Sequence, residues 1–202
     1  MNEIILKGKL KGIEYSHTLN DIEYDKAYVS VRKDNLPDDD VIPIRFKKFS
    51  NYYKDGDEVE LQGNIRSYST IDDTGKHKVE VYVFTYFEIP SEELNKNNYF
   101  EIDGNICKID SIHKTQSGKD NIHFIIANNI FSSDGKRKVN SYIPMVAWGK
   151  VARELAKLKV GDRIKTSGQF HSRTYKKKLN DDEIEFRTAY EGLVLHFEKV
   201  EN

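Results

Sequence analysis

The chain has 202 residues, of which 32% are charged, and its formal net charge at pH 7 is −1. This length allows one large domain or two of about 100 residues each, and either could bury a hydrophobic core. No segment approaches the roughly 18 to 20 apolar residues of a membrane span, and the apolar run near the start is too short for a signal peptide. We therefore expect a cytoplasmic protein.

Charge is distributed unevenly between the two halves of the chain. Residues 1–97 contain 14 Lys and Arg against 19 Asp and Glu, a net charge of −5, whereas residues 98–202 contain 18 against 14, a net charge of +4. Because positive charge attracts polyanions, only the second half is suited to bind one.

Residues that would support catalysis or metal binding are sparse. The single cysteine, Cys107, excludes a disulfide within the chain and a zinc site with several thiolates, and its apolar neighbours predict a buried, inert thiol. The six histidines lack metal-ligand spacing, and no phosphate-binding loop or nucleophile-elbow motif occurs. We predict no metal, no cofactor and no enzymatic activity.

Frequent Tyr, Phe, Val and Ile, with recurring turn signals, predict a mostly β chain. In the first half, the strands are predicted at residues 3–15, 26–33, 41–46, 58–70 and 78–89. Pro90 and the polar residues after it interrupt the strand pattern. We therefore predict a first domain at 1–90, a linker at 91–97 and a second domain at 98–202.

The second half repeats this order and adds a helix. Its strands are predicted at residues 98–110, 121–131, 136–148, 163–176 and 183–200. Between the third and fourth of these, Val151, Leu155 and Leu158 recur at three- and four-residue spacing, which predicts a short amphipathic helix at 150–157.

Paired residues support an internal repeat. Asn2 precedes Gly8 by six residues, as Asn98 precedes Gly104, and at the same offset of 96 the stretch 28–31 (YVSV) aligns with 124–127 (FIIA). Further pairs follow in order at larger offsets: Ile42-Pro43 with Ile143-Pro144, Gly56-Asp57 with Gly161-Asp162, and Gly63 and Ser67 with Gly168 and Ser172. The shared order makes chance a poor explanation for these matches.

Five strands with a helix between the third and fourth are the arrangement of the OB-fold, a five-stranded Greek-key barrel. We therefore predict two tandem OB-folds, the second with a short helix between strands three and four. Another small barrel or a β-sandwich would also accommodate these strands, but the position of the helix favours the OB-fold.

One set of residues in the second half forms a recognisable pattern: Asn98-x5-Gly104, FIIAN at 124–128, IPMVAWGKVA at 143–152, Gly161-Asp162 and GQFHSRTY at 168–175. This pattern resembles the bacterial and phage single-stranded DNA-binding proteins (SSB). In the first half only Asn2, Gly8, Gly56-Asp57 and Gly63 remain of it, so that half resembles the family as a diverged copy.

The resemblance implies that bases stack on Trp148 and Tyr175 and that Arg173 holds phosphate. Strand alternation gives an independent reason, because Gln169, His171, Arg173 and Tyr175 share one strand face, which is poor core material and good stacking material. Alternatively, Trp148 plugs the barrel and Tyr175 is an exposed hairpin tip. With the loop lysines, the candidate DNA-binding residues are Trp148, Tyr175, Arg173, His171, Gln169, Tyr142, Lys136, Arg137, Lys138, Lys150, Lys176, Lys177 and Lys178.

Weaker candidates occur in the first repeat. They are Phe46, Lys47, Arg66 and Tyr68, which occupy roughly equivalent positions. Phe46 aligns with Trp148 if a one-residue gap is allowed, but core packing is the preferred role for it. The first repeat is therefore either a weaker binding surface or a dimerisation module.

These observations predict sequence-tolerant binding of single-stranded DNA in replication, recombination or repair, by base stacking and phosphate contacts. RNA is the alternative ligand, and a tandem OB-fold adaptor for protein interaction or oligomerisation, with little DNA binding, is the alternative function. A homodimer would assemble four barrels, with a monomer as the alternative. The resemblance implies a bacterial, phage or mobile-element protein associated with the nucleoid. Because the sequence ends directly after a predicted strand, we do not expect recruitment of enzymes by a disordered acidic tail.

Overall fold

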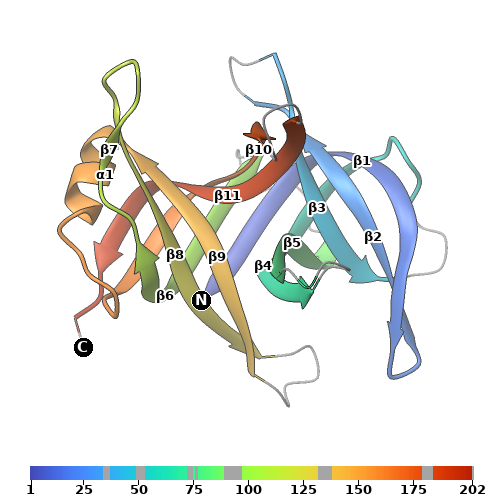
Figure 1. Cartoon of the computed structure of the whole chain (residues 1–202). Coiled ribbons are helices and arrows are strands. Elements are labelled where there is room, and N and C mark those ends of the chain that lie inside the picture. The colour runs from blue at the N-terminus through green and yellow to red at the C-terminus, as the bar shows by residue number, and fades with distance from the viewer. Residues whose placement is uncertain are drawn as a thin grey trace.

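The computed structural model describes residues 1–33, 37–48, 53–71, 75, 77–88, 97–131, 138–178 and 184–201. Its elements are β1 (Asn2–Leu19), β2 (Ile22–Val31), β3 (Asp40–Lys47), β4 (Glu58–Ile71), β5 (His77–Glu88), β6 (Asn98–Ile109), β7 (His113–Lys114), β8 (Asp120–Phe131), β9 (Lys138–Trp148), α1 (Gly149–Leu155), β10 (Arg163–Lys178) and β11 (Ile184–Lys199) (Figure 1). Among these residues, no helix has the length and apolar character needed to cross a membrane.

Each repeat closes into a five-stranded barrel. In the first, the strand order is β2-β3-β5-β4-β1, and pairing of β1 with β2 closes the ring; in the second, the order is β6-β10-β11-β9-β8, closed by pairing of β6 with β8. In each barrel the third and fifth strands are parallel, β3 with β5 and β9 with β11. Helix α1 lies between the third and fourth strands of the second barrel. The prediction of two tandem OB-folds is confirmed.

The two barrels are joined through their first strands. Strand β1 pairs with β6 in antiparallel register, with Asn2 opposite Ile102, Ile4 opposite Phe100 and Leu6 opposite Asn98, so the sheet is continuous across the molecule. Ile4 and Phe100 are equivalent residues of the repeats, and the pairing is symmetric about them. An approximate two-fold axis therefore passes through this pair. The predicted linker 91–97 lies, apart from Asn97, outside the described residues.

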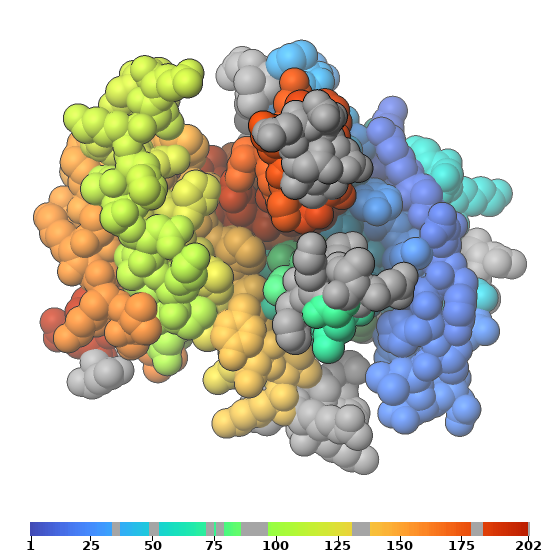
Figure 2. Space-filling model, viewed as in Figure 1, coloured from blue at the N-terminus to red at the C-terminus, as the bar shows by residue number. Residues whose placement is uncertain are grey.

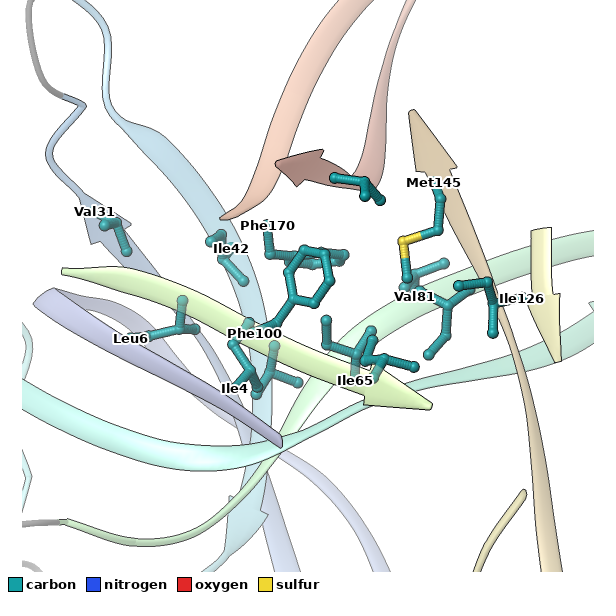
Figure 3. Close-up of a cluster of buried hydrophobic side chains, with 14 of the residues drawn as sticks. Ile4, Leu6, Val31, Ile42, Ile65, Val81, Phe100, Ile126, Met145 and Phe170 are labelled. Carbon is teal, nitrogen blue, oxygen red and sulfur yellow. The ribbon is translucent and has the colours of Figure 1, made fainter. Parts of the chain in front are cut away.

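The buried apolar side chains of both barrels form one connected cluster. Figure 3 shows its centre, where Ile4 and Leu6 of the first barrel lie near Phe100. Phe100 and Phe170 are fully buried. Burial of each such side chain contributes roughly 1.5–3 kcal/mol to stability.

The glycine turns before the fourth strands confirm one pair of repeat anchors. Gly56 and Gly161 both have φ of 95°, a left-handed conformation that favours glycine. The N–H of Gly56 donates to the carbonyl of Leu10, and that of Gly161 donates to the carbonyl of Ile106, each at 2.8 Å. The two turns are therefore the same structure repeated.

The predicted alignment of residues 28–31 with 124–127, which belong to the second strand of each barrel, was wrong by one residue. A Cβ on Gly8 would lie 2.2 Å from the carbonyl oxygen of Ser30, and one on Gly104 would lie 2.6 Å from that of Ala127, so Ser30 corresponds to Ala127. Tyr28 is accordingly exposed on the outer face, whereas Phe124 is buried.

The prediction of a buried cysteine was also wrong. Cys107 is exposed, because it alternates with the buried Ile106 along β6 and therefore points away from the core. Partial burial still raises the pKa of its thiol above the ordinary value.

The first hairpin is longer than its strand pattern predicted. Strands β1 and β2 pair as far as Leu19 opposite Ile22. Asn20 and Asp21 form the turn with φ of 50° and 61°, which is typical of the tight turns that join twisted antiparallel strands.

Candidate nucleic-acid interface

Two aromatic side chains lie on the outer face of β9. Ile143, Met145 and Ala147 point into the barrel and are buried, as period-two alternation predicts. Tyr142 and Trp148, on the opposite face, are 51% and 39% exposed. Trp148 therefore does not plug the barrel, and its ring is accessible from solvent.

The chain turns immediately after Trp148. This residue ends β9 and occupies the N-cap position of α1, and Gly149 follows with φ of 58°. Val146 shares the outer face with Tyr142 and Trp148 but is 4% exposed. Pro144 and the buried Val146 therefore lie between the two exposed rings on this face of the strand.

Arg173 and Tyr175 form a second row on β10. The guanidinium carbon of Arg173 lies 5.4 Å from the centre of the Tyr175 ring, within the range of a cation–π interaction. Its Nε donates to Glu191 at 3.1 Å, and the Arg173 side chain remains 53% exposed. Glu191, which also lies 3.8 Å from Nδ1 of His123, therefore fixes the orientation of Arg173 while leaving much of the guanidinium accessible.

The row continues along a hairpin that extends past the barrel. Strand β10 pairs with β6 only as far as Gly168, but it pairs with β11 as far as Lys178 opposite Ile184. Figure 2 shows this hairpin in orange, between the two barrels at the top of the view. Lys176, Lys177 and Lys178 are exposed along it.

Phe186 on the same hairpin was not among the predicted binding residues. This side chain is 65% exposed, and the ammonium of Lys176 lies 5.6 Å from the centre of its ring. Because the two residues are cross-strand partners, the alternation of apolar and charged residues in 184–187 is the signal that could have identified Phe186.

His171 is on the predicted face of β10, and its side chain contacts the first barrel. Its Nδ1 is 2.5 Å from Oδ2 of Asp40 in the first barrel. The three consecutive aspartates at 38–40 predict a solvated loop, but Asp40 begins β3 and is buried. Burial by itself would raise the pKa of Asp40, but hydrogen bonds from His171 and from the N–H of Ser172 outweigh it, and the pKa is lowered. His171 thus contacts the other barrel, and the neighbouring Gln169 is half-buried.

The remaining candidates of the second repeat are at the ends of β9. Lys138 is exposed at its start, and Lys150 is exposed in the first turn of α1 after its end. Lys136 and Arg137 lie outside the described residues.

Two candidates of the first repeat are buried. Phe46 is 8% exposed in the core, so core packing is confirmed for it and its alternative alignment with Trp148 was wrong. With Ile42 equivalent to Ile143, the exposed Lys47 corresponds to Trp148. Arg66 is also 8% exposed, and its guanidinium lies 4.0 Å from the centre of the Phe84 ring.

Tyr68 belongs to a compact aromatic cluster on the outside of the first barrel. The guanidinium of Arg45 lies 4.6 Å from the ring centre of Tyr68 and 4.5 Å from that of Tyr82. Glu80 lies 3.3 Å from Arg45 and accepts a hydrogen bond from the Tyr68 hydroxyl. Burial and this hydrogen bond raise the pKa of Tyr68. Arg45 therefore occupies the ring faces to which a base would otherwise have access.

Across the part of the chain that the structure describes, no group of three or more His, Cys, Asp and Glu side chains is arranged to hold a metal ion. What the described part of the second repeat presents is a surface with four exposed aromatic rings, those of Tyr142, Trp148, Tyr175 and Phe186, together with an oriented arginine and several lysines. Such a surface can stack bases and neutralise phosphates.

Comparisons with known proteins find a matching family model and similar solved structures. Residues 97–194 match the model of the single-strand binding protein family. The fold is similar to crystal structures of the single-stranded DNA binding protein of Thermus aquaticus, in wild-type and deletion-mutant forms, each with 16% sequence identity and a TM-score of 0.72. The likeness covers 100% of this chain, with 94% of the wild-type chain and 95% of the mutant chain. A search of curated protein sequences finds no match.

Proposed function

The second repeat of this chain belongs to the single-strand binding protein family, and from that premise we propose that the chain binds single-stranded DNA without reading its sequence. The observation that carries the proposal is the placement of Tyr142, Trp148 and Tyr175 on the outside of one barrel, with Arg173 beside Tyr175. Every base has a face that can stack on an aromatic ring, so such contacts are indifferent to sequence.

Phosphate contacts supply the second part of the proposed mechanism. Arg173 is oriented by Glu191 and remains half exposed, and Lys176, Lys177 and Lys178 follow it along the hairpin. Cations that neutralise phosphates release counterions, so affinity should fall steeply as salt rises. No step of this mechanism breaks a covalent bond, and we assign the chain a binding role rather than a catalytic one.

The first repeat has a weaker surface of this kind. Lys47 replaces the equivalent tryptophan, Phe46 is in the core, and Arg45 covers the rings of Tyr68 and Tyr82. The net charge of −5 over residues 1–97 also opposes binding of a polyanion. We therefore assign most of the affinity to the second repeat.

The test uses the single tryptophan, Trp148. Oligo-dT is titrated into the protein at low and then moderate salt while tryptophan fluorescence and the anisotropy of labelled DNA are recorded. We expect saturable quenching and an affinity that falls as salt rises. Binding without quenching would remove Trp148 from the interface, and absence of binding at low salt would contradict the function and favour a protein-interaction adaptor.

Arg173→Ala tests the phosphate contact separately. We expect weaker binding by a similar factor for oligo-dT, oligo-dA and mixed sequences, with a shallower dependence on salt, because one counterion-releasing contact is lost. A loss confined to one sequence would instead assign base reading to Arg173. Labelled oligo-U in the same assay distinguishes DNA from RNA.

We further propose that two chains associate, so that four barrels act together in replication, recombination or repair. Sedimentation of the protein alone and with oligo-dT measures the number of chains. A monomer in both conditions would contradict the dimer while leaving strand binding unaffected.

A further inference from the structure

The strand that carries Arg173 and Tyr175 has one edge without a neighbouring strand. Beyond Gly168, β10 no longer pairs with β6, although pairing with β11 continues. Backbone N–H groups along such an edge need other partners. The N–H of Phe170 donates to Asn98 of the same barrel at 2.9 Å, and that of Ser172 donates to Asp40 of the first barrel at 2.7 Å.

Asp40 is bound from both barrels. Its carboxylate is 1% exposed. Oδ2 lies 2.5 Å from Nδ1 of His171, and Oδ1 lies 3.1 Å from the ammonium of Lys33 and accepts the Ser172 N–H. The next residue, Val41, donates its N–H to the Ser172 hydroxyl at 2.9 Å. A buried carboxylate with this set of partners fixes the positions of the groups that bind it.

These contacts lie at the base of the binding row, the name used here for His171, Arg173 and Tyr175 on β10. His171, Arg173 and Tyr175 alternate along one face of β10, so fixing the backbone at Ser172 fixes the direction in which the next two side chains of the row point. The hairpin beyond them has no β6 neighbour, and the contacts with Asp40 are at the point where it leaves the barrel.

A second contact acts on the other strand of the interface. The Ser67 hydroxyl of the first barrel accepts the N–H of Tyr142 at 2.7 Å. Tyr142 is the exposed ring at the beginning of the β9 row. Strands β9 and β10, which carry Tyr142, Trp148 and Tyr175, are thus both bound by residues of the first barrel.

The approximate two-fold axis relates Asp40 to a position of the second barrel that has no carboxylate. Ser67 and Ser172 are equivalent, and their hydrogen bonds to Tyr142 and Val41 are a symmetric pair. The residue equivalent to Asp40 is Ser141, which is fully buried and whose hydroxyl has no hydrogen-bond partner among the described residues. Among the described residues, the β10–β11 hairpin is bound by a carboxylate of the other barrel, whereas the equivalent β4–β5 hairpin meets Ser141 at that position.

We propose that Asp40, assisted by Ser67, is a positioning residue through which the first barrel holds the DNA-binding surface of the second. This inference rests on the proposed function. The first barrel then contributes to affinity without contacting DNA itself, by keeping the β10–β11 hairpin in its binding-competent orientation.

The test compares Asp40→Ala with Asp40→Asn and with Ser141→Ala, its symmetry-related control. If the loosened hairpin adopts the competent orientation for about a tenth to a fifth of the time, affinity for oligo-dT falls about five- to tenfold, because apparent affinity scales with the competent fraction. We expect that loss for Asp40→Ala, a smaller one for Asp40→Asn, whose amide oxygen can still accept the Ser172 N–H, and none for Ser141→Ala. Equal affinities for all three would overturn the proposal.

A double-mutant cycle separates positioning from a general loss of folding. If Asp40 acts through the row, Asp40→Ala has little further effect in a protein that already carries Arg173→Ala and Tyr175→Ala. If the fold-loss in affinity of the combined variant equals the product of the separate losses, Asp40 acts elsewhere and the proposal is overturned.

Hydrogen exchange of the free protein supplies a readout that needs no DNA. In Asp40→Ala we expect faster exchange of backbone amides in β10 and β11 beyond Gly168, with exchange in β6 and β8 unchanged. Unchanged exchange in the hairpin overturns the proposal. If the wild-type protein fails to bind oligo-dT, the proposed function fails, whereas binding by the wild type with equal binding by Asp40→Ala overturns the positioning role alone.

Discussion

Asn2 and Asn98, which are equivalent residues of the two repeats, each bind both backbone groups of one residue in the fourth strand of their barrel. The amide of Asn2 donates to the carbonyl of Ile65 at 2.8 Å and accepts its N–H at 2.9 Å; the amide of Asn98 does the same to Phe170 at 2.7 and 2.9 Å. In each barrel an asparagine side chain therefore replaces one step of strand pairing.

Asn98→Ala should lower the free energy of unfolding by about 2–4 kcal/mol, because it leaves the buried N–H and C=O of Phe170 without partners at roughly 1–3 kcal/mol each. Urea denaturation followed by circular dichroism measures this change. Asn105→Ala, an exposed residue of the same strand, should change it by less than about 0.5 kcal/mol. Equal effects of the two substitutions would contradict the role of the Asn98 amide.

Tyr175→Ala should weaken binding of oligo-dT by about 1–3 kcal/mol, the value of one base–aromatic contact, and Tyr175→Phe should retain most of the affinity because it retains the ring. Anisotropy of labelled DNA measures both. The matched control is Tyr15→Ala, which removes an exposed tyrosine from the first repeat and should have no effect. Similar losses for Tyr15→Ala and Tyr175→Ala would place the strand elsewhere.

The stabilisation that Asp40 provides should depend on pH. Its pKa in the folded protein is lowered below the value of about 3.9 expected for an unfolded chain, so the ionised carboxylate stabilises the fold. This contribution is complete above about pH 5 and is lost as pH falls through the folded pKa. The difference in free energy of unfolding between the wild type and Asp40→Asn should therefore be constant near neutral pH and shrink on acidification. A difference that stays the same down to pH 3 would argue against an ionised Asp40.

Phe100→Ala should destabilise both barrels together. The side chain is fully buried at the junction of β1 and β6, and its removal should cost about 3–5 kcal/mol. Unfolding in urea can be followed by Trp148 fluorescence, which reports on the second barrel, and by circular dichroism, which reports on both barrels. Because the core is continuous, the two transitions should coincide in the wild type and in the variant. Separate transitions would show that the barrels fold independently.

Much of the fold could be predicted from short-range pattern. Period-two alternation agrees with the positions of Ile143, Met145 and Ala147 in the core and of Tyr142 and Trp148 outside it. The asparagine and glycine anchors revealed the repeat because each has a backbone role that few other residues can perform. In Gly56 and Gly161, that role is the positive φ of a turn.

Other features could not be predicted because they depend on contacts between distant residues. Asp40 and His171 are 131 residues apart and meet only because the barrels pack across β1 and β6. From strand alternation alone, His171 is therefore assigned to the stacking face, and its contact with Asp40 is not predicted. Phe46 was misplaced because a shift of one residue exchanges the two faces of a strand, and a single sequence does not fix that register.

The pairing of β1 with β6 occurs within one chain. Strands on separate molecules come apart on dilution, whereas the association of two strands of one molecule does not depend on protein concentration. The junction between these two barrels, and with it the contact of Asp40 with Ser172, therefore remains formed however dilute the protein becomes.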